Sequence, residues 1–174
     1  IHYFLIIFLC KLYNKYINIL NIFYIDYFYM NSNILIIFIP IILGFISTLF
    51  INKNNIPSSA KSPINPPKWL FGVVWPILYL LLGYSSYLIY NSKALNKNKI
   101  FILYIIHIIL LSIWFPVFVN YYNRYLSFSS LIFILLYAVY LYFEYNKINV
   151  VASYCLIPYI LWLCFASYLA YYSY

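Results

Sequence analysis

Five long stretches of apolar residues dominate this sequence. They cover about residues 34–51, 69–90, 100–119, 128–145 and 150–174. A helix needs roughly 20 apolar residues to cross the ~30 Å hydrocarbon layer of a bilayer. A backbone in lipid must satisfy its own hydrogen bonds, and these stretches lack the alternating polarity of barrel strands. We therefore predict an all-α polytopic membrane protein, a bundle of five transmembrane helices.

The balance of residue types excludes the common soluble classes. Hydrophobic residues make up 67% of the chain and charged residues only 7%, against roughly half and a quarter in soluble domains. This excludes a soluble enzyme, a disordered chain and a secreted disulfide scaffold. The net charge is +8, but the basic residues fall mostly between the apolar stretches, as in loops beside anionic headgroups. Membrane lipid is thus an expected partner and nucleic acid is not.

The first 29 residues differ from the rest. They are rich in Ile, Tyr, Phe, Asn and Lys, contain no Gly or Pro, and precede the single methionine, Met30. No basic region precedes their apolar part and no small-residue cleavage site follows it, so they do not resemble a secretory signal. We expect residues 1–29 to be an upstream extension or a poorly ordered segment, with translation starting at Met30. The alternative is a membrane-associated extension.

Residues that bind metals or transfer protons are few and scattered. They are Cys10, Cys155, Cys164, His2, His107, Asp26 and Glu144. This spacing predicts no metal site, no catalytic pair and no cofactor. His107 stands near the middle of an apolar stretch, where an ionisable residue is a functional candidate. The competing interpretation is a neutral histidine that hydrogen-bonds a hydroxyl on a neighbouring helix.

Three motifs carry a resemblance. Residues 66–79 read PPKWLFGVVWPILY, residues 114–118 read WFPVF, and residues 158–162 read PYILW. In this order they resemble the TspO/MBR family of translocator proteins and tryptophan-rich sensory proteins. Pro40 and Gly44 fit the first helix of that family, so the resemblance covers nearly all of residues 30–174.

The resemblance implies a five-helix membrane domain over residues 30–174. It implies an integral membrane receptor or carrier that binds protoporphyrin, haem or similar flat lipophilic ligands in a pocket within the bundle. It further implies a homodimer and, for a eukaryotic member, the mitochondrial outer membrane. Alternatives from the same family are light-dependent degradation of porphyrin by pocket tryptophans, and sterol binding or transport.

The resemblance also implies a set of ligand-binding residues. They are Phe71, Gly72, Val74, Trp75, His107, Trp114, Trp162, Ala166 and Leu169. A flat macrocycle requires an apolar slot with aromatic faces, and Gly72 would let a ligand or a helix approach the backbone closely. The competing interpretation is that Trp75 and Trp162 only pack the bundle core, which predicts no saturable ligand.

The chain departs from the family pattern at several positions. Ile64 stands where the first loop usually has an aromatic residue, and Leu111, Ser130 and Ala170 replace polar or acidic residues. The sterol-recognition pattern lacks its basic residue after Tyr171, and we do not predict cholesterol binding. No inverted repeat or charge pair within the apolar stretches indicates a coupled transporter.

Overall fold

The computed structural model describes residues 33–52, 64, 66–121 and 123–172. The chain divides into two units, residues 1–35 and 36–174, and the first is described only at residues 33–35. The predicted N-terminal extension, residues 1–29, therefore lies outside the described residues. The second unit contains the helical bundle.

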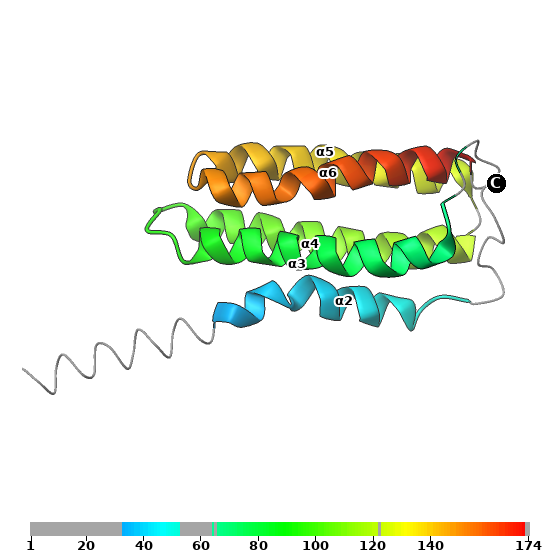
Figure 1. The fold of residues 1–174 in the computed structure, drawn as a ribbon, viewed down its shortest axis with the longest axis horizontal. Coiled ribbons are helices and arrows are strands. Elements are labelled where there is room, and N and C mark those ends of the chain that lie inside the picture. Colours follow the sequence, from blue (N-terminus) through cyan, green and yellow to red (C-terminus); the bar gives the residue numbers. More distant parts are fainter. Residues whose placement is uncertain (1–32, 53–63, 65, 122, 173–174) are drawn as a thin grey trace, which may run out of the picture. The chain divides into compact units, whose positions relative to one another are not determined.

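The described residues are helical and contain no strand. Their elements are the 3-10 helix η1 (Ile34–Ile37) and the α-helices α2 (Ile39–Thr48), α3 (Lys68–Tyr90), α4 (Lys97–Tyr121), α5 (Arg124–Asn146) and α6 (Val150–Tyr172) (Figure 1). The four helices from α3 to α6 are long and apolar enough to cross a membrane. For the described part of the chain, the all-α prediction and four of the predicted membrane helices are confirmed.

The first apolar stretch differs from its prediction as one transmembrane helix over residues 34–51. Pro40 lies in the first turn of α2. Proline lacks an amide hydrogen and its ring disfavours a helix that continues through it, so it is tolerated at the start of a helix. After Thr48 only turn-like bonds follow, from the Leu49 and Phe50 amides to the Ile46 and Ser47 carbonyls. The ten residues of α2 rise about 15 Å. The α-helix here is therefore shorter than the predicted residues 34–51, and a fifth transmembrane helix stays a prediction.

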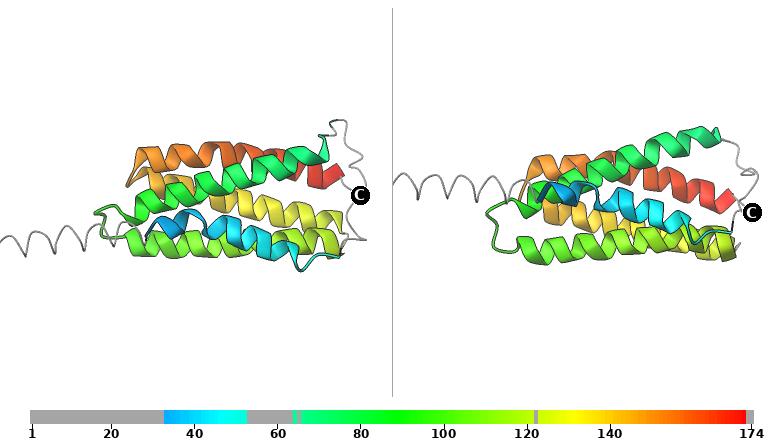
Figure 2. Two further views of the ribbon diagram at one scale, coloured as in Figure 1. Left: turned by 60° about the horizontal axis from the view of Figure 1, so that its bottom comes forward. Right: turned by 90° about the horizontal axis from the view of Figure 1, so that it is seen from below.

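The long helices form two antiparallel pairs. The α3–α4 and α5–α6 connections are short and lie at one end of the bundle (Figure 1). α6 packs against both α5 and α3, α4 packs against α5, and α2 lies over the seam between α3 and α4 (Figure 2). The first turns of α3 and the last turns of α6 therefore meet at the opposite end of the bundle.

Asparagine side chains cap the starts of two helices, and one of these helices begins before its predicted stretch. The Asn123 side-chain oxygen accepts a hydrogen bond from the Leu126 amide at 3.1 Å, which starts α5 four residues before the predicted residue 128. The Asn149 side chain accepts bonds from the amides of Val151 and Ala152 at the start of α6. Such bonds satisfy amides that have no partner within the helix.

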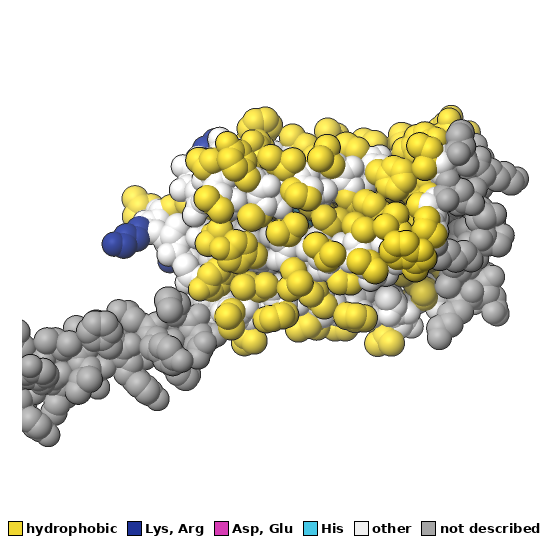
Figure 3. Space-filling view, viewed as in Figure 1, with side chains coloured by type: hydrophobic (Ala, Val, Ile, Leu, Met, Phe, Trp, Pro, Cys, Tyr) yellow, Lys and Arg dark blue, Asp and Glu magenta, His cyan; other side chains and the backbone are white. Residues whose placement is uncertain are grey.

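Apolar side chains occupy both the centre and the exterior of the bundle. Leu82, Leu141, Leu156 and Leu163 are fully buried between the helices. The face seen in Figure 3 is also covered by hydrophobic side chains, and Lys and Arg side chains gather near the end where α3 joins α4. An apolar exterior of this extent matches a surrounding of lipid rather than water.

Candidate functional site

Five aromatic side chains gather between the first half of α3 and the last half of α6. This α3–α6 aromatic cluster consists of Phe71, Trp75, Tyr79, Trp162 and Phe165. The Trp75 and Trp162 ring centroids lie 6.3 Å apart at an interplanar angle of 89°, and Phe71 meets Trp162 at 5.8 Å. Tyr79 and Phe165 contact Trp75 and Trp162 at 5.5 and 5.4 Å. Spacings of three and four residues place these rings on one face of each helix.

The indole nitrogen of Trp162 is a buried donor. Among the described residues, it has no hydrogen-bond partner, although buried tryptophans usually have one. An unmet buried donor costs about 1–3 kcal/mol. The cluster therefore offers an N–H group to any acceptor that enters between the helices.

The other predicted residues on α3 and α6 differ in how deeply they are buried. Ala166 and Leu169 are buried on α6, and Val74 is partly buried against the core. Gly72 is exposed, and a Cβ atom placed there would meet nothing described within 4 Å. The structure therefore shows no close helix approach at Gly72, and contact of Gly72 with a ligand stays a prediction.

Trp114 lies apart from the α3–α6 aromatic cluster. Its indole nitrogen donates to the Ser127 carbonyl of α5 at 3.2 Å, and its ring stacks on Phe118 at 5.2 Å. Each of these partners belongs to α4 or α5. Trp114 therefore packs between those two helices, and its ligand-binding role stays a prediction.

His107 is fully buried on α4 and bonded to α6. Its Nε2 atom shares a 2.8 Å hydrogen bond with the Tyr159 hydroxyl, and its ring stacks on Tyr137 at 5.4 Å. This is the hydroxyl bond that we expected of a neutral structural histidine, while its ligand role stays a prediction. Within the described residues, no group of three or more His, Cys, Asp or Glu could hold a metal ion.

Removal of the Tyr159 hydroxyl tests how much this buried bond stabilises the bundle. The His107 Nδ1 atom has no partner among the described residues, so Tyr159→Phe would leave both ring nitrogens unpaired. We expect a loss of about 1–3 kcal/mol in the free energy of unfolding, measured by denaturation in detergent. Tyr154→Phe is the control, since Tyr154 is 57% exposed on the same helix. Equal stability of the two variants would contradict this assignment.

Tyr79, Phe165 and Tyr159 were not among the predicted site residues. Tyr79 and Phe165 follow Trp75 and Trp162 by four and three residues, which was a signal that they share a helix face with them. Tyr159 carried no such signal, because its contact with His107 depends on how α4 and α6 pack.

A groove of about 320 Å³ lies elsewhere, between α2 and α4. None of the nine predicted ligand-binding residues lines it. The geometry thus presents two separate features, an aromatic cluster between α3 and α6 and an open apolar groove between α2 and α4.

Comparison with known proteins decides the family. The model of the TspO/MBR family matches residues 36–174, which is most of the chain. The chain belongs to the TspO/MBR family. This TspO/MBR protein is 29% identical to a translocator protein homolog of Schizosaccharomyces pombe over 137 residues, 75% of this chain and 83% of the relative.

Two further relatives give similar values. The translocator protein of Ovis aries is 28% identical over 134 residues, 74% of this chain and 79% of the relative. The tryptophan-rich protein TspO of Chlorobaculum tepidum is 28% identical over 112 residues, 63% of this chain and 70% of the relative. Together with the four long apolar helices, family membership identifies this TspO/MBR chain as a multi-pass membrane protein.

Proposed function

We propose that this TspO/MBR protein is a membrane receptor or carrier that binds protoporphyrin, haem or a similarly flat lipophilic molecule between α3 and α6. The observation that carries the proposal is the α3–α6 aromatic cluster, with the Trp75 and Trp162 rings 6.3 Å apart. Two indoles on facing helices offer a macrocycle aromatic surface from both sides. The ligand-binding set implied by the resemblance includes both indoles.

Ligand entry would exchange ring–ring contacts for ring–ligand contacts. Trp75 and Trp162 touch edge to face, so a macrocycle between them requires these side chains to move apart, and such rotamer changes on binding are common. An aromatic pair contributes only about 0.5–1.5 kcal/mol beyond its burial. The buried Trp162 N–H would then donate to a carboxylate of the tetrapyrrole.

The proposal extends to the first apolar stretch and to assembly. We infer that η1 and α2 belong to a fifth membrane pass, because α2 packs along both α3 and α4 and its residues are apolar. A homodimer and, in a eukaryotic cell, the mitochondrial outer membrane complete the proposal. Both rest on the family resemblance.

Quenching of tryptophan fluorescence by protoporphyrin tests ligand binding in detergent-solubilised protein. We expect saturable quenching for the native chain, and an apparent Kd raised roughly twofold to tenfold in Trp75→Phe and in Trp162→Phe, a loss of about 0.4–1.4 kcal/mol. Trp69→Phe is the matched control, since Trp69 lies on the same helix but is 67% exposed and outside the cluster.

Non-saturable quenching that is identical in all four proteins would mean unspecific partitioning and would overturn the proposal.

Illumination of the same samples distinguishes a receptor from a porphyrin-degrading enzyme. Bleaching of bound porphyrin that requires Trp75 and Trp162 would favour the enzyme. The contact between these two rings is the observation that makes this second function worth testing.

A further inference from the structure

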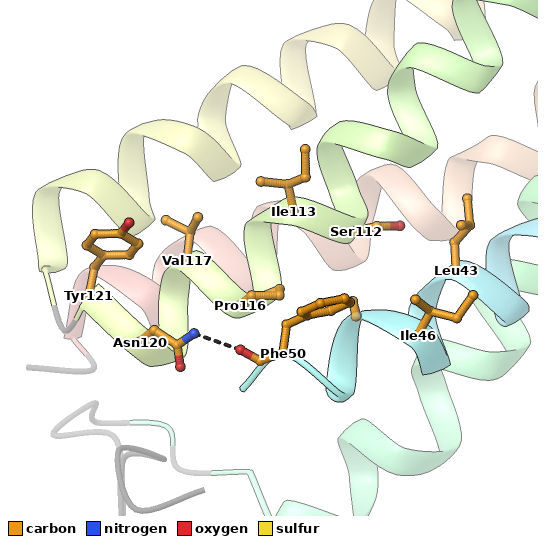
Figure 4. A pocket seen from close by; sticks show the side chains of 10 residues that line it. Leu43, Ile46, Phe50, Ser112, Ile113, Pro116, Val117, Asn120 and Tyr121 are labelled. Atoms are coloured by element: carbon orange, nitrogen blue, oxygen red, sulfur yellow. Dashed lines mark hydrogen bonds between the residues drawn. The ribbon is translucent and has the colours of Figure 1, made fainter. Parts of the chain in front are cut away.

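The groove between α2 and α4 is lined mostly by apolar side chains (Figure 4). Its apolar lining comes from Leu43, Ile46, Phe50, Ile113, Pro116 and Val117. Phe50 is 67% exposed and Ile113 is 55% exposed, so the groove opens to the surroundings of the bundle. For a membrane protein, those surroundings are lipid chains.

The polar side chains of the groove already use their hydrogen-bonding groups within the protein. The Ser47 and Ser112 hydroxyls donate to the Gly44 and Ile108 carbonyls, each at 2.7 Å. The Asn120 side chain donates to the Phe50 carbonyl and accepts from the Asn52 amide, both at 2.8 Å. These bonds leave a wall suited to an occupant without polar groups, which favours an alkyl chain over a macrocycle with carboxylates.

The dimensions of the groove match one leaflet of a bilayer. On α4 it runs from Ser112 to Tyr121, nine steps that rise about 14 Å, and a leaflet contributes about half of the ~30 Å hydrocarbon layer. The volume of about 320 Å³ lies at the lower end of the roughly 300–1,000 Å³ of ligand sites. The groove exists because α2 ends at Thr48 while α4 continues beside it to Tyr121.

The end of the groove at Tyr121 suits a phosphate head group. Tyr121 is the last residue of α4 and is 70% exposed, and tyrosine is enriched at the depth of lipid head groups. The apolar lining of the groove therefore ends at Asn120 and Tyr121, at the end of α4, where the head group of a phospholipid would lie.

We propose that the groove between α2 and α4 holds one acyl chain of a phospholipid, with the phosphate at the Asn120–Tyr121 end. This lipid site shares no residue with the α3–α6 aromatic cluster and does not depend on the proposed tetrapyrrole binding. It makes one phospholipid a retained component of the protein rather than part of the exchanging lipid around it.

Native mass spectrometry of the full chain tests this site. The protein is reconstituted into vesicles of phosphatidylglycerol, phosphatidylcholine and cholesterol and extracted in mild detergent. The mass of the protein with any retained lipid is then measured. We expect one retained phospholipid per chain. Val117→Phe fills the groove from α4 and Ile46→Phe fills it from α2, and each should lower the retained fraction at least fivefold.

Ile102→Phe is the matched control, because Ile102 is 59% exposed on α4 and does not line the groove. It should retain phospholipid like the native chain, and protoporphyrin binding should be the same in every variant. The two filling substitutions lie on different helices that line the groove. If one variant does not fold, the other still tests whether filling the groove lowers phospholipid retention. The proposal would be overturned if the native chain retained no phospholipid, or if filling the groove left retention unchanged. Cholesterol retained in place of phospholipid, or a second copy of the chain covering the groove, would also overturn it.

Discussion

Replacement of Gly83 by alanine is expected to destabilise the bundle, and replacement by valine to destabilise it further. A Cβ atom at Gly83 would collide with the Ile37 backbone, to which its three nearest atoms all belong. Backbone atoms cannot rotate away as the end of a side chain can, and overpacking of this kind costs about 1–3 kcal/mol. Because alanine also gains about 0.5–1 kcal/mol in helix propensity, we expect a net loss of up to about 2 kcal/mol for Gly83→Ala, measured by thermal unfolding in detergent.

Gly72→Ala is the matched control for Gly83→Ala. Both glycines lie inside α3, so each substitution brings the same gain in helix propensity of about 0.5–1 kcal/mol. Nothing described lies within 4 Å of a Cβ atom at Gly72. The Gly72→Ala variant should therefore be as stable as the native protein or slightly more stable. Equal destabilisation of the two variants would contradict the close packing of the Ile37 backbone against Gly83.

Removal of the Trp162 ring should weaken protoporphyrin binding most. Trp162 contacts Phe71, Trp75 and Phe165, so its ring is the centre of the α3–α6 aromatic cluster. Loss of an aromatic surface from a ligand site removes about 1.5–3 kcal/mol of apolar burial, which corresponds to roughly tenfold to hundredfold in Kd. We expect this increase in Trp162→Ala, measured by the anisotropy of porphyrin fluorescence.

Trp162→Phe separates the ring from its N–H group. The variant keeps an aromatic face but loses the donor that has no partner among the described residues. A hydrogen bond contributes about 0.5–1.5 kcal/mol net, so the Kd for protoporphyrin should rise roughly twofold to tenfold. Octaethylporphyrin lacks carboxylates, and its Kd should be unaffected by the same substitution. An equal effect on both porphyrins would show that the N–H group does not recognise a carboxylate.

The positions of the long helices could be predicted from hydropathy because the bilayer imposes their length. The ends could not, because polar residues at the interface continue the helix without adding apolar character. α4 begins at Lys97 rather than at the predicted residue 100, and α5 begins at Arg124 after the Asn123 cap. Pro40 was visible in the sequence, but the break just before it and the short length of α2 were not predicted.

The faces that turn inward could not be predicted, because in lipid both sides of a helix are apolar. Ile108 is 1% exposed and Ile109 is 47% exposed, although they are neighbours of the same type. A soluble helix would have marked these two sides with different residues. The Trp75–Trp162 pair came from a family motif rather than from periodicity, and the α2–α4 groove had no sequence signal at all.

One titration tests the proposed ligand site most directly. The chain has four tryptophans, so Trp69→Phe combined with Trp114→Phe leaves Trp75 and Trp162 as the only indoles. Protoporphyrin should quench the emission of this variant saturably, with one ligand bound per chain. Quenching that rises linearly without saturation, or that is no stronger than in the complementary variant with only Trp69 and Trp114, would contradict a tetrapyrrole site between α3 and α6.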